Sequence, residues 1–213
     1  MAAGAAQARS GSRSRIQTEN RALITQAALD VFSTDGYRGA TVDRIAERAG
    51  MSKTNLLYYY PSKEDIYRTV IEQTVEDWLR PFAQIDPDGE PIEELRRYIT
   101  VKLKMSETSP EASRLFANEI QRGAPLVMEF LTTRLKALVD EKAAVIGTWI
   151  DQGRLAPVDP YHLIFAIWAT TQHYADFEAQ IGALLGSQAK GPGFSEQASH
   201  AVLSILLNGI RPR

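Results

Sequence analysis

The segment TVDRIAERAGMSKTNLLYYYP, residues 41–61, constrains the fold more than any other part of this sequence. Its tyrosine run is compatible with a β-strand that ends at Pro61 or with a short helix that carries aromatic side chains. Thr41 and Ser52 each precede a short run and provide the side-chain oxygen that caps a helix N-terminus, while Gly50 suits the turn between the runs. Two short capped helices joined by a glycine-containing turn are typical of a helix-turn-helix motif. We therefore expect helices here rather than a strand.

The rest of the chain has apolar residues at three- and four-residue spacing, which predicts amphipathic helices throughout. One helix is expected to begin near Gln17 and to stop at Gly36, and Ser62 is expected to cap another together with Asp65. Further helices are expected over residues 62–80, 92–106, 111–122, 125–153, 159–181 and 195–208. The predicted fold class is all-α, with about nine helices in total. An N-terminal three-helix helix-turn-helix domain is followed by a larger helical ligand-binding and dimerisation domain.

Charge is unevenly distributed along the chain. Residues 1–63 hold nine Lys/Arg and five Asp/Glu, although the whole chain has a formal net charge of −2. This excess of base indicates that the N-terminal part meets a polyanion. Residues 1–15 are rich in Ala, Gly and Ser and contain arginines but no acid, which predicts a disordered basic tail. We expect the DNA-binding domain over residues 16–62 and the effector-binding and dimerisation domain over residues 63–213.

Several functional classes are disfavoured by composition. The chain has no cysteine, so disulfides and thiolate metal sites are excluded. No segment approaches the roughly 20 apolar residues of a membrane span, and no signal peptide is recognisable, so we expect a cytoplasmic protein. His162, His173 and His200 fit no metal-ligand or nucleophile motif. We therefore expect no metal, no cofactor and no enzymatic activity. A helical scaffold for protein partners is a competing hypothesis, and it would lack salt-sensitive binding to duplex DNA.

The order of caps, turn and aromatic residues in TVDRIAERAGMSKTNLLYYYPSKEDIY resembles the DNA-binding domain of the tetracycline-repressor-like (TetR) family. Four further segments resemble a branch of that family that represses pyrimidine-utilisation genes: SRLF (113–116), LKALVDEK (135–142), APVDPYHLIFAIWATTQHYADF (156–177) and GIRPR (209–213). The resemblance implies a homodimeric repressor that binds palindromic double-stranded operator DNA, with uracil or thymine as effector. The alternative is a TetR-family repressor of efflux or catabolic genes that responds to a different small aromatic or lipophilic ligand.

Helix geometry separates the side chains of the expected recognition helix. At about 100° per residue, Tyr58 lies opposite the core-facing Tyr60, so Tyr58 should point into the major groove together with Thr54 and Asn55. Tyr59 lies at the flank, where its hydroxyl can reach a phosphate. The cap positions and the family resemblance indicate further residues that contact phosphate. One of these residues, Lys53, can also reach a guanine edge. The added residues are Thr41, Arg44, Ser52, Lys53 and Lys63.

The effector implied by the resemblance is a flat ring with an N–H between two carbonyl groups. Such a ring calls for apolar or aromatic walls and a few converging polar groups. Trp168 and Gln172 lie four residues apart on a helix that is apolar nearly all round, and an unpaired buried glutamine costs on the order of 1–3 kcal/mol. The expected ligand-binding residues are Trp78, Trp168, Gln172, Lys102, Phe116 and Arg114. A ligand here is expected to shift the helix over 62–80, and with it the spacing of two recognition helices.

The last two long helices have more apolar surface than one bundle needs. They are expected over about 159–181 and 195–208. We expect these two helices to pair with their copies in a four-helix dimer interface.

Overall fold

The computed structural model describes residues 2–212, with side chains from Arg15 onward. Within this range the chain is helical and contains no strand, which confirms the predicted all-α class. The chain divides into two compact units between Gln73 and Thr74. This boundary lies inside a helix and later than the expected boundary at residues 62–63. The reason is packing: Tyr67 is buried and meets the ring of Phe32 edge-on, with ring centroids 4.9 Å apart, so the start of that helix belongs to the first core.

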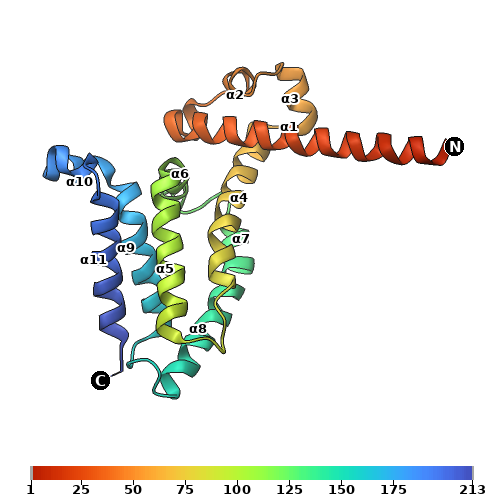
Figure 1. Cartoon of the computed structure of the whole chain (residues 1–213). Coiled ribbons are helices and arrows are strands. Elements are labelled where there is room, and N and C mark those ends of the chain that lie inside the picture. Colours follow the sequence, from red (N-terminus) through yellow and green to blue (C-terminus); the bar gives the residue numbers. More distant parts are fainter. Residues whose placement is uncertain (1, 213) are drawn as a thin grey trace. The chain divides into compact units, whose positions relative to one another are not determined.

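The first unit contains α1 (Ala2–Gly39), α2 (Val42–Arg48), α3 (Lys53–Tyr59) and the start of α4 (Lys63–Ala83) (Figure 1). Both predicted caps are present, because Thr41 Oγ1 accepts from the Arg44 amide and Ser52 Oγ accepts from the Asn55 amide, each at 3.2 Å. Ser62 Oγ likewise accepts from the Asp65 amide at 3.1 Å. The buried side chains that hold the helices together are Ile24, Ala28, Phe32, Ile45, Leu56 and Ile66.

The start of α1 differs from the expected disordered tail. The backbone is helical from Ala2, and the side chains of residues 1–14 lie outside the described part of the structure. Alanine and arginine are among the best helix formers, so this segment can extend a helix that begins further along the chain. The predicted stop at Gly36 is present as a break in α1, where φ is +67° and ψ is 172°.

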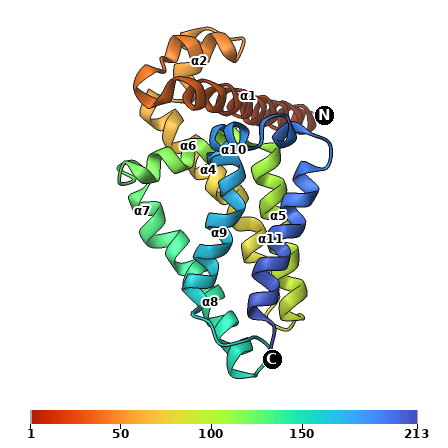
Figure 2. The same ribbon diagram turned by 90° about the vertical axis from the view of Figure 1, so that its left-hand side faces the viewer.

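The second unit contains the end of α4 and the helices that follow. These are α5 (Pro91–Thr108), α6 (Pro110–Gln121), α7 (Met128–Phe130), the π-helical η1 (Leu131–Leu135), α8 (Lys136–Asp151), α9 (Pro160–Asp176), α10 (Glu178–Leu185), the 3₁₀ turn η2 (Gly186–Lys190) and α11 (Phe194–Ile210). α5 lies beside both α9 and α11 (Figures 1 and 2). The core that these helices share with α8 includes Ile99, Ile146, Trp149, Ile164 and Ile167. None of the described helices is long and apolar enough to cross a bilayer.

Two expected helices are divided in the structure. The helix predicted over 159–181 breaks at Phe177, where φ is −115° and ψ is 27°, and the chain restarts as α10. The helix predicted over 125–153 consists of α7, η1 and α8, with a π-helical turn in the middle. An apolar pattern does not reveal the π-helical turn, because π and α turns bury nearly the same residues. The break at Phe177 raises the number of helices above the nine expected.

Candidate functional site

The outer face of α3 is composed of exposed polar and aromatic side chains. Tyr58 is 74% exposed, and Thr54 and Asn55 are exposed beside it. Leu56 and Tyr60 are buried in the core of the first unit. The burial pattern therefore sorts the tyrosine run as helix geometry predicts, and it leaves a free polar surface on α3.

Tyr59 lies between that surface and the core. Its hydroxyl accepts a hydrogen bond from Asn20 Nδ2 at 2.7 Å, and its ring meets Tyr58 edge-on with centroids 5.3 Å apart. Because the phenol accepts from Asn20, its own proton remains free to be donated outward. This position suits a hydrogen bond to a phosphate oxygen.

The cations around α3 form ion pairs with carboxylates of the same unit. Arg44 pairs with Asp35, and Lys53 Nζ lies 2.9 Å from Asp43 Oδ2. The Lys53–Asp43 pair is exposed, where an ion pair contributes only about 0–1 kcal/mol, so exchange of Asp43 for a phosphate costs little. The Asp35 side chain is only 16% exposed, so the Arg44–Asp35 pair is less readily exchanged.

Lys63 has an intramolecular role that the sequence did not indicate. Its ammonium donates to the carbonyl oxygens of Tyr37 at 2.8 Å and Ala40 at 3.0 Å, and it lies 4.6 Å from the centroid of the Tyr37 ring. A cation at the C-terminal end of a helix compensates the unpaired carbonyls there. The lysine thus holds the end of α1 against the start of α4, in addition to any contact with phosphate.

In the second unit, five of the six expected ligand-binding residues line one cavity. The cavity has a volume of about 40 Å³. Its walls include Trp78 of α4, Lys102 of α5, Phe116 of α6, and Trp168 and Gln172 of α9. The remaining lining residues are Val75, Leu79, Tyr98 and Leu135. Residues separated by nearly a hundred positions in sequence therefore converge as predicted.

Aromatic rings form most of this cavity, which we call the effector cavity after the ligand-binding role that the sequence predicts for its residues. Trp78 meets Phe116 edge-on with centroids 5.3 Å apart, and the Lys102 ammonium lies 4.5 Å from the centroid of the Trp78 ring. Trp168 Nε1 donates to the Tyr98 hydroxyl at 2.6 Å. The volume is little more than one or two water molecules occupy. A six-membered ring therefore enters only if these side chains move apart.

Tyr98 also lines this cavity, although the sequence did not single it out. It is buried and hydrogen-bonds the indole of Trp168, which orients one wall of the effector cavity. A signal existed, because Tyr98 precedes Lys102 by four residues and thus lies on the same face of α5. Burial raises the pKa of the Tyr98 hydroxyl, so the phenol stays protonated, whereas the hydrogen bond from Trp168 lowers it.

Lys102 is the charged group of the effector cavity. Only 4% of its surface is exposed, and burial lowers its pKa to about 8, against the opposing attraction of Asp176. Asp176 Oδ1 accepts a hydrogen bond from Ser113 Oγ at 2.6 Å. A lysine with such a pKa is mostly protonated at neutral pH and can donate to a carbonyl group.

Arg114 does not line the effector cavity, and this corrects the expectation. Its guanidinium donates to Glu178 Oε2 at 3.2 Å and to the Ala175 carbonyl at 3.4 Å. The reason is helical geometry: Arg114 and Phe116 are two residues apart, so their side chains diverge by about 200° around α6. Phe116 faces the cavity, and Arg114 instead ties α6 to the start of α10.

Family models match nearly the whole chain. Residues 24–70 match the family described as "Bacterial regulatory proteins, tetR family", and residues 71–213 match "YcdC-like protein, C-terminal region". The chain belongs to the TetR family. Regulators of this family bind operator DNA and small-molecule ligands, typically as dimers. This TetR-family chain is accordingly a DNA-binding transcriptional regulator.

A curated relative agrees with that assignment, and solved structures share the fold. The chain is 49% identical over 203 residues to the HTH-type transcriptional regulator RutR of Escherichia coli strain K12, covering 95% of this chain and 96% of the relative. The ketosteroid transcriptional regulator KstR2 of Mycobacterium tuberculosis shares the fold, with a TM-score of 0.71 and 22% identity over 91% of this chain and 95% of that one. AibR, solved with isovaleryl coenzyme A and operator DNA, has a TM-score of 0.68 at 17% identity over 88% and 97%.

The TetR-family chain is a regulator rather than an enzyme, because its close homologues are transcriptional regulators. In the described part of the structure, no group of three or more His, Asp or Glu side chains is arranged to hold a metal ion.

Proposed function

We propose that this chain is a cytoplasmic, homodimeric repressor of pyrimidine metabolism genes. It binds a palindromic operator and takes uracil or thymine as its effector. The observation that carries the proposal is the convergence of Trp78, Lys102, Phe116, Trp168 and Gln172 on one cavity. Similarity to RutR over 95% of the chain supports the same assignment.

The chemistry of the effector cavity suits a pyrimidinedione. Trp78, Phe116 and Trp168 offer aromatic surface for a flat ring. The amide of Gln172 offers both a donor and an acceptor, which complements adjacent N–H and C=O groups on the ring edge. The Lys102 ammonium adds a donor for a second carbonyl group. A small polar ring satisfies all of these groups, whereas a long lipid would offer no partner to the half-buried Gln172 amide or to the buried Lys102 ammonium.

The DNA-binding half of the proposal depends on α3. Tyr58, Thr54 and Asn55 present donors, acceptors and an aromatic ring at its exposed face. One recognition helix reads only a few base pairs, so two copies on half-sites about one helical turn apart supply the specificity.

Coupling between the two functions runs through α4. This helix is continuous from Lys63 to Ala83 and carries Trp78 of the effector cavity. Because the cavity is too small for a ring as it stands, a bound ring selects a conformation in which its walls have separated. A ligand that prefers this conformation changes operator affinity by the same free energy with which operator DNA changes ligand affinity.

The affinity for uracil and the affinity for operator DNA are both measured on the full-length protein. Calorimetric titration with uracil and thymine should give saturable binding, and saturating uracil should change operator affinity in a fluorescence anisotropy titration. Gln172→Ala and Trp168→Ala should weaken uracil binding by at least about tenfold, since each removes a hydrogen-bonding group or a ring wall. Gln180→Ala is the matched control, because Gln180 is an exposed glutamine of α10 outside the effector cavity. Wild-type uracil affinity in both cavity variants would refute the proposed site.

A thermal-shift screen against nucleobases and small lipophilic aromatics distinguishes the competing effector classes. Pyrimidinediones should raise the melting temperature by mass action. A larger shift from a lipophilic compound that also releases the operator would favour efflux or catabolic control instead.

A further inference from the structure

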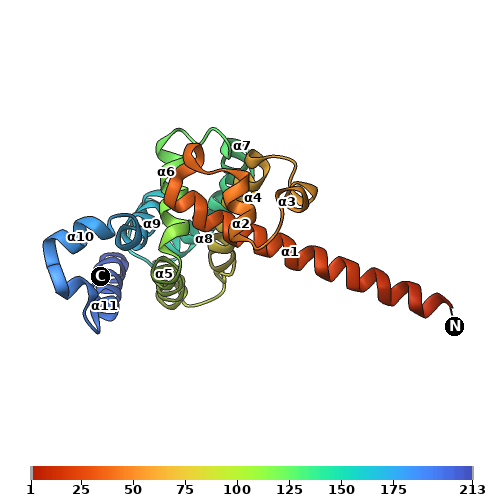
Figure 3. The ribbon, with the colours of Figure 1, turned by 90° about the horizontal axis from the view of Figure 1, so that it is seen from above.

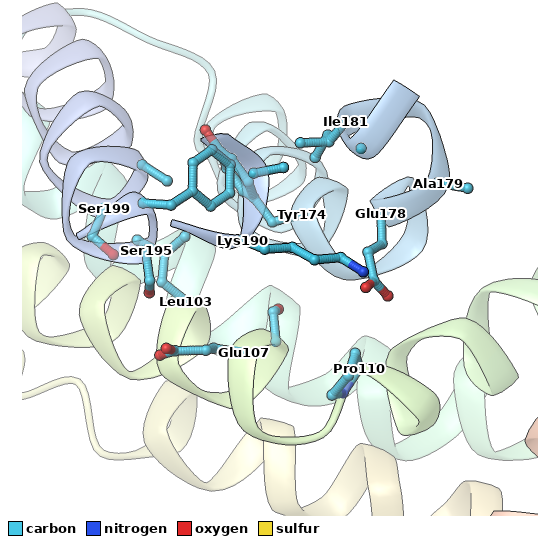
Figure 4. Close-up of a pocket in the computed structure, with 15 residues that line it drawn as sticks. Leu103, Glu107, Pro110, Tyr174, Glu178, Ala179, Ile181, Lys190, Ser195 and Ser199 are labelled. Atoms are coloured by element: carbon cyan, nitrogen blue, oxygen red, sulfur yellow. The ribbon is translucent and has the colours of Figure 1, made fainter. Parts of the chain in front are cut away.

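A second, larger cavity lies in the same unit and shares no residue with the effector cavity. Its volume is about 490 Å³, within the range of roughly 300–1,000 Å³ typical of small-molecule sites. It is a half-open pocket bordered by the C-terminal end of α5, the end of α9, the segment from α10 through η2, and the start of α11 (Figure 4). We call this space the α10 cavity.

The walls of the α10 cavity are largely apolar. Leu103, Ile181 and Phe194 line it, and the rings of Tyr174 and Phe194 meet with centroids 6.2 Å apart. Hydroxyl groups of Ser106, Ser195 and Ser199 are the small polar groups of the lining. An apolar body of aromatic or short acyl character therefore suits the interior.

The charges at the rim favour an anion. Two carboxylates line the cavity, but each has a cationic partner: Glu107 accepts from Lys104 at 3.0 Å, and Glu178 accepts from Arg114 at 3.2 Å. The hydrogen bond from Lys104, followed by one from Ser195, holds the pKa of Glu107 below its usual value. Lys190 lies along the cavity in Figure 4 with its ammonium on the Glu178 side, and no salt bridge of Lys190 is found among the described residues. Three cations, Lys104, Arg114 and Lys190, thus stand against two carboxylates at the rim.

The roof of the α10 cavity is a segment bounded by glycines. Figure 3 shows α10 and the turn after it looping out beyond the ends of α9 and α11. Gly186, the first residue of η2, and Gly193, just before α11, have φ of +58° and +83°. Glycine adopts such angles at little steric cost, so these two residues let the chain turn sharply over the cavity.

We propose that the α10 cavity is a second small-molecule site of this regulator, which takes an amphipathic organic anion with an aromatic or short acyl body. The apolar walls hold the body, and Lys190 pairs with the anionic group. Because the lining residues differ from those of the effector cavity, the site binds independently of the pyrimidine proposed there.

A pair of fluorescent probes tests the class of ligand. 8-Anilinonaphthalene-1-sulfonate carries an anionic group on an aromatic body, and N-phenyl-1-naphthylamine has the same body without charge. The sulfonate should bind the full-length protein saturably, with one site per chain. Lys190→Ala should weaken binding of the sulfonate by about tenfold, because one charge-assisted contact is lost, and leave binding of the neutral probe unchanged. Equal effects on the two probes would contradict the role of Lys190.

A filling substitution tests the location. A Cβ built on Gly182 meets no atom within 4 Å, and Gly182 lines the cavity from within α10. Gly182→Leu should therefore fill the space without a clash and abolish saturable binding of the sulfonate. Gly147→Leu is the matched control, because Gly147 lies within α8, also has no atom within 4 Å of a built Cβ, and lines neither cavity.

Two further measurements distinguish probe binding in the α10 cavity from probe binding in the effector cavity. Saturating uracil and the Gln172→Ala substitution should both leave the sulfonate titration unchanged. Displacement of the probe by uracil would assign it to the effector cavity and overturn the proposal. An absence of saturable binding to the dimer, or wild-type binding to Gly182→Leu, would overturn it as well.

Discussion

At the scale of single residues, the buried charge of Lys102 lowers the stability of the fold, although the same charge is proposed to bind the effector. Its ammonium is buried over the Trp78 ring, and burial lowers its pKa from the usual 10.5 to about 8. The unfolded chain holds this proton up to about pH 10.5, so between pH 8 and 10.5 it binds more protons than the folded chain. The free energy of unfolding therefore rises with pH across that window, and the cost of burying the charge is fully present below pH 8.

Lys102→Met should stabilise the protein and weaken uracil binding. The buried charge disappears while the apolar stem is replaced, so at pH 7 the free energy of unfolding should rise by roughly 1–3 kcal/mol, after allowance for the lost contact with the Trp78 ring. Denaturant unfolding at pH 7 measures this change.

In the wild type, uracil affinity should fall as pH rises through about 8, because the ammonium donor is lost. The variant should bind uracil more weakly with a flat pH profile between pH 6.5 and 9, a range set by that lysine pKa. An identical pH profile in both proteins would contradict a donor role for Lys102.

Tyr58→Ala should weaken operator binding without loss of stability. The side chain is 74% exposed and is placed on the expected groove face, so its removal should cost operator affinity about tenfold and leave the melting temperature unchanged. Lys63→Ala is not an equivalent test, because Lys63 binds two backbone carbonyls and its loss should also destabilise the first unit. Gel-shift titrations at physiological salt, with circular dichroism for stability, separate the two effects. Unchanged operator affinity in Tyr58→Ala would exclude that tyrosine from the interface.

Single residues also show how far sequence reasoning reached. Trp168 and Gln172 were predictable because both lie on one face of an apolar helix, and periodicity fixes their relative direction. Arg114 was misplaced because it lies two residues from Phe116, so its side chain points about 200° away around α6 and meets Glu178 instead. The bonds of Lys63 to the Tyr37 and Ala40 carbonyls depend on how the chain turns after Gly36, which periodicity does not encode.

At the scale of elements, the helices with local signals were predicted best. Thr41 and Ser52 mark their helix starts because a cap depends only on residues three positions away. The division between α9 and α10 and the π-helical η1 escaped prediction, since both depend on packing with elements far along the chain. η1 has functional interest because Leu135 lines the effector cavity and Arg134 donates to Glu76 of α4 at 2.6 Å. A π-helical turn within a helix often lies at a functional site.

The contact between η1 and α4 should carry part of the coupling between effector and operator. Arg134→Ala should change the melting temperature little, because the pair is largely exposed. It should reduce the effect of saturating uracil on operator affinity by about 0.5–2 kcal/mol, since η1 and α4 then respond separately to the ring. Anisotropy titrations with and without uracil measure that effect.

The charge-swapped pair Arg134→Glu with Glu76→Arg should restore the coupling. Arg80→Ala is the control, because Arg80 pairs with Asp77 inside α4 itself, at 2.7 Å. If Arg134→Ala keeps the full wild-type response to uracil, this contact takes no part in coupling.

At the scale of the whole molecule, apolar side chains exposed on the last helices remain to be explained. Leu184 of α10 is 76% exposed and Ile205 of α11 is 72% exposed, while Phe165 of α9 is about half exposed. Large apolar side chains gathered on neighbouring helices commonly mark an interface between subunits. Pairing of α9 and α11 with their copies, as in the dimers typical of TetR-family regulators, would cover Phe165 and Ile205.

Ile205→Asp should dissociate the dimer and abolish tight operator binding. A carboxylate at the centre of an apolar contact loses its hydration without a partner, so the dissociation constant of the dimer should rise steeply. Operator affinity should then fall by at least about 100-fold, because each half-site is bound separately and the gain from two linked recognition helices is lost. Sedimentation velocity and anisotropy measure the two effects on the same samples.

Met128→Asp is the control, since Met128 is an exposed apolar residue of α7, away from α9 and α11. A dimeric Ile205→Asp variant would show that α11 is not at the interface, and a monomeric variant with wild-type operator affinity would show that DNA binding does not require the dimer.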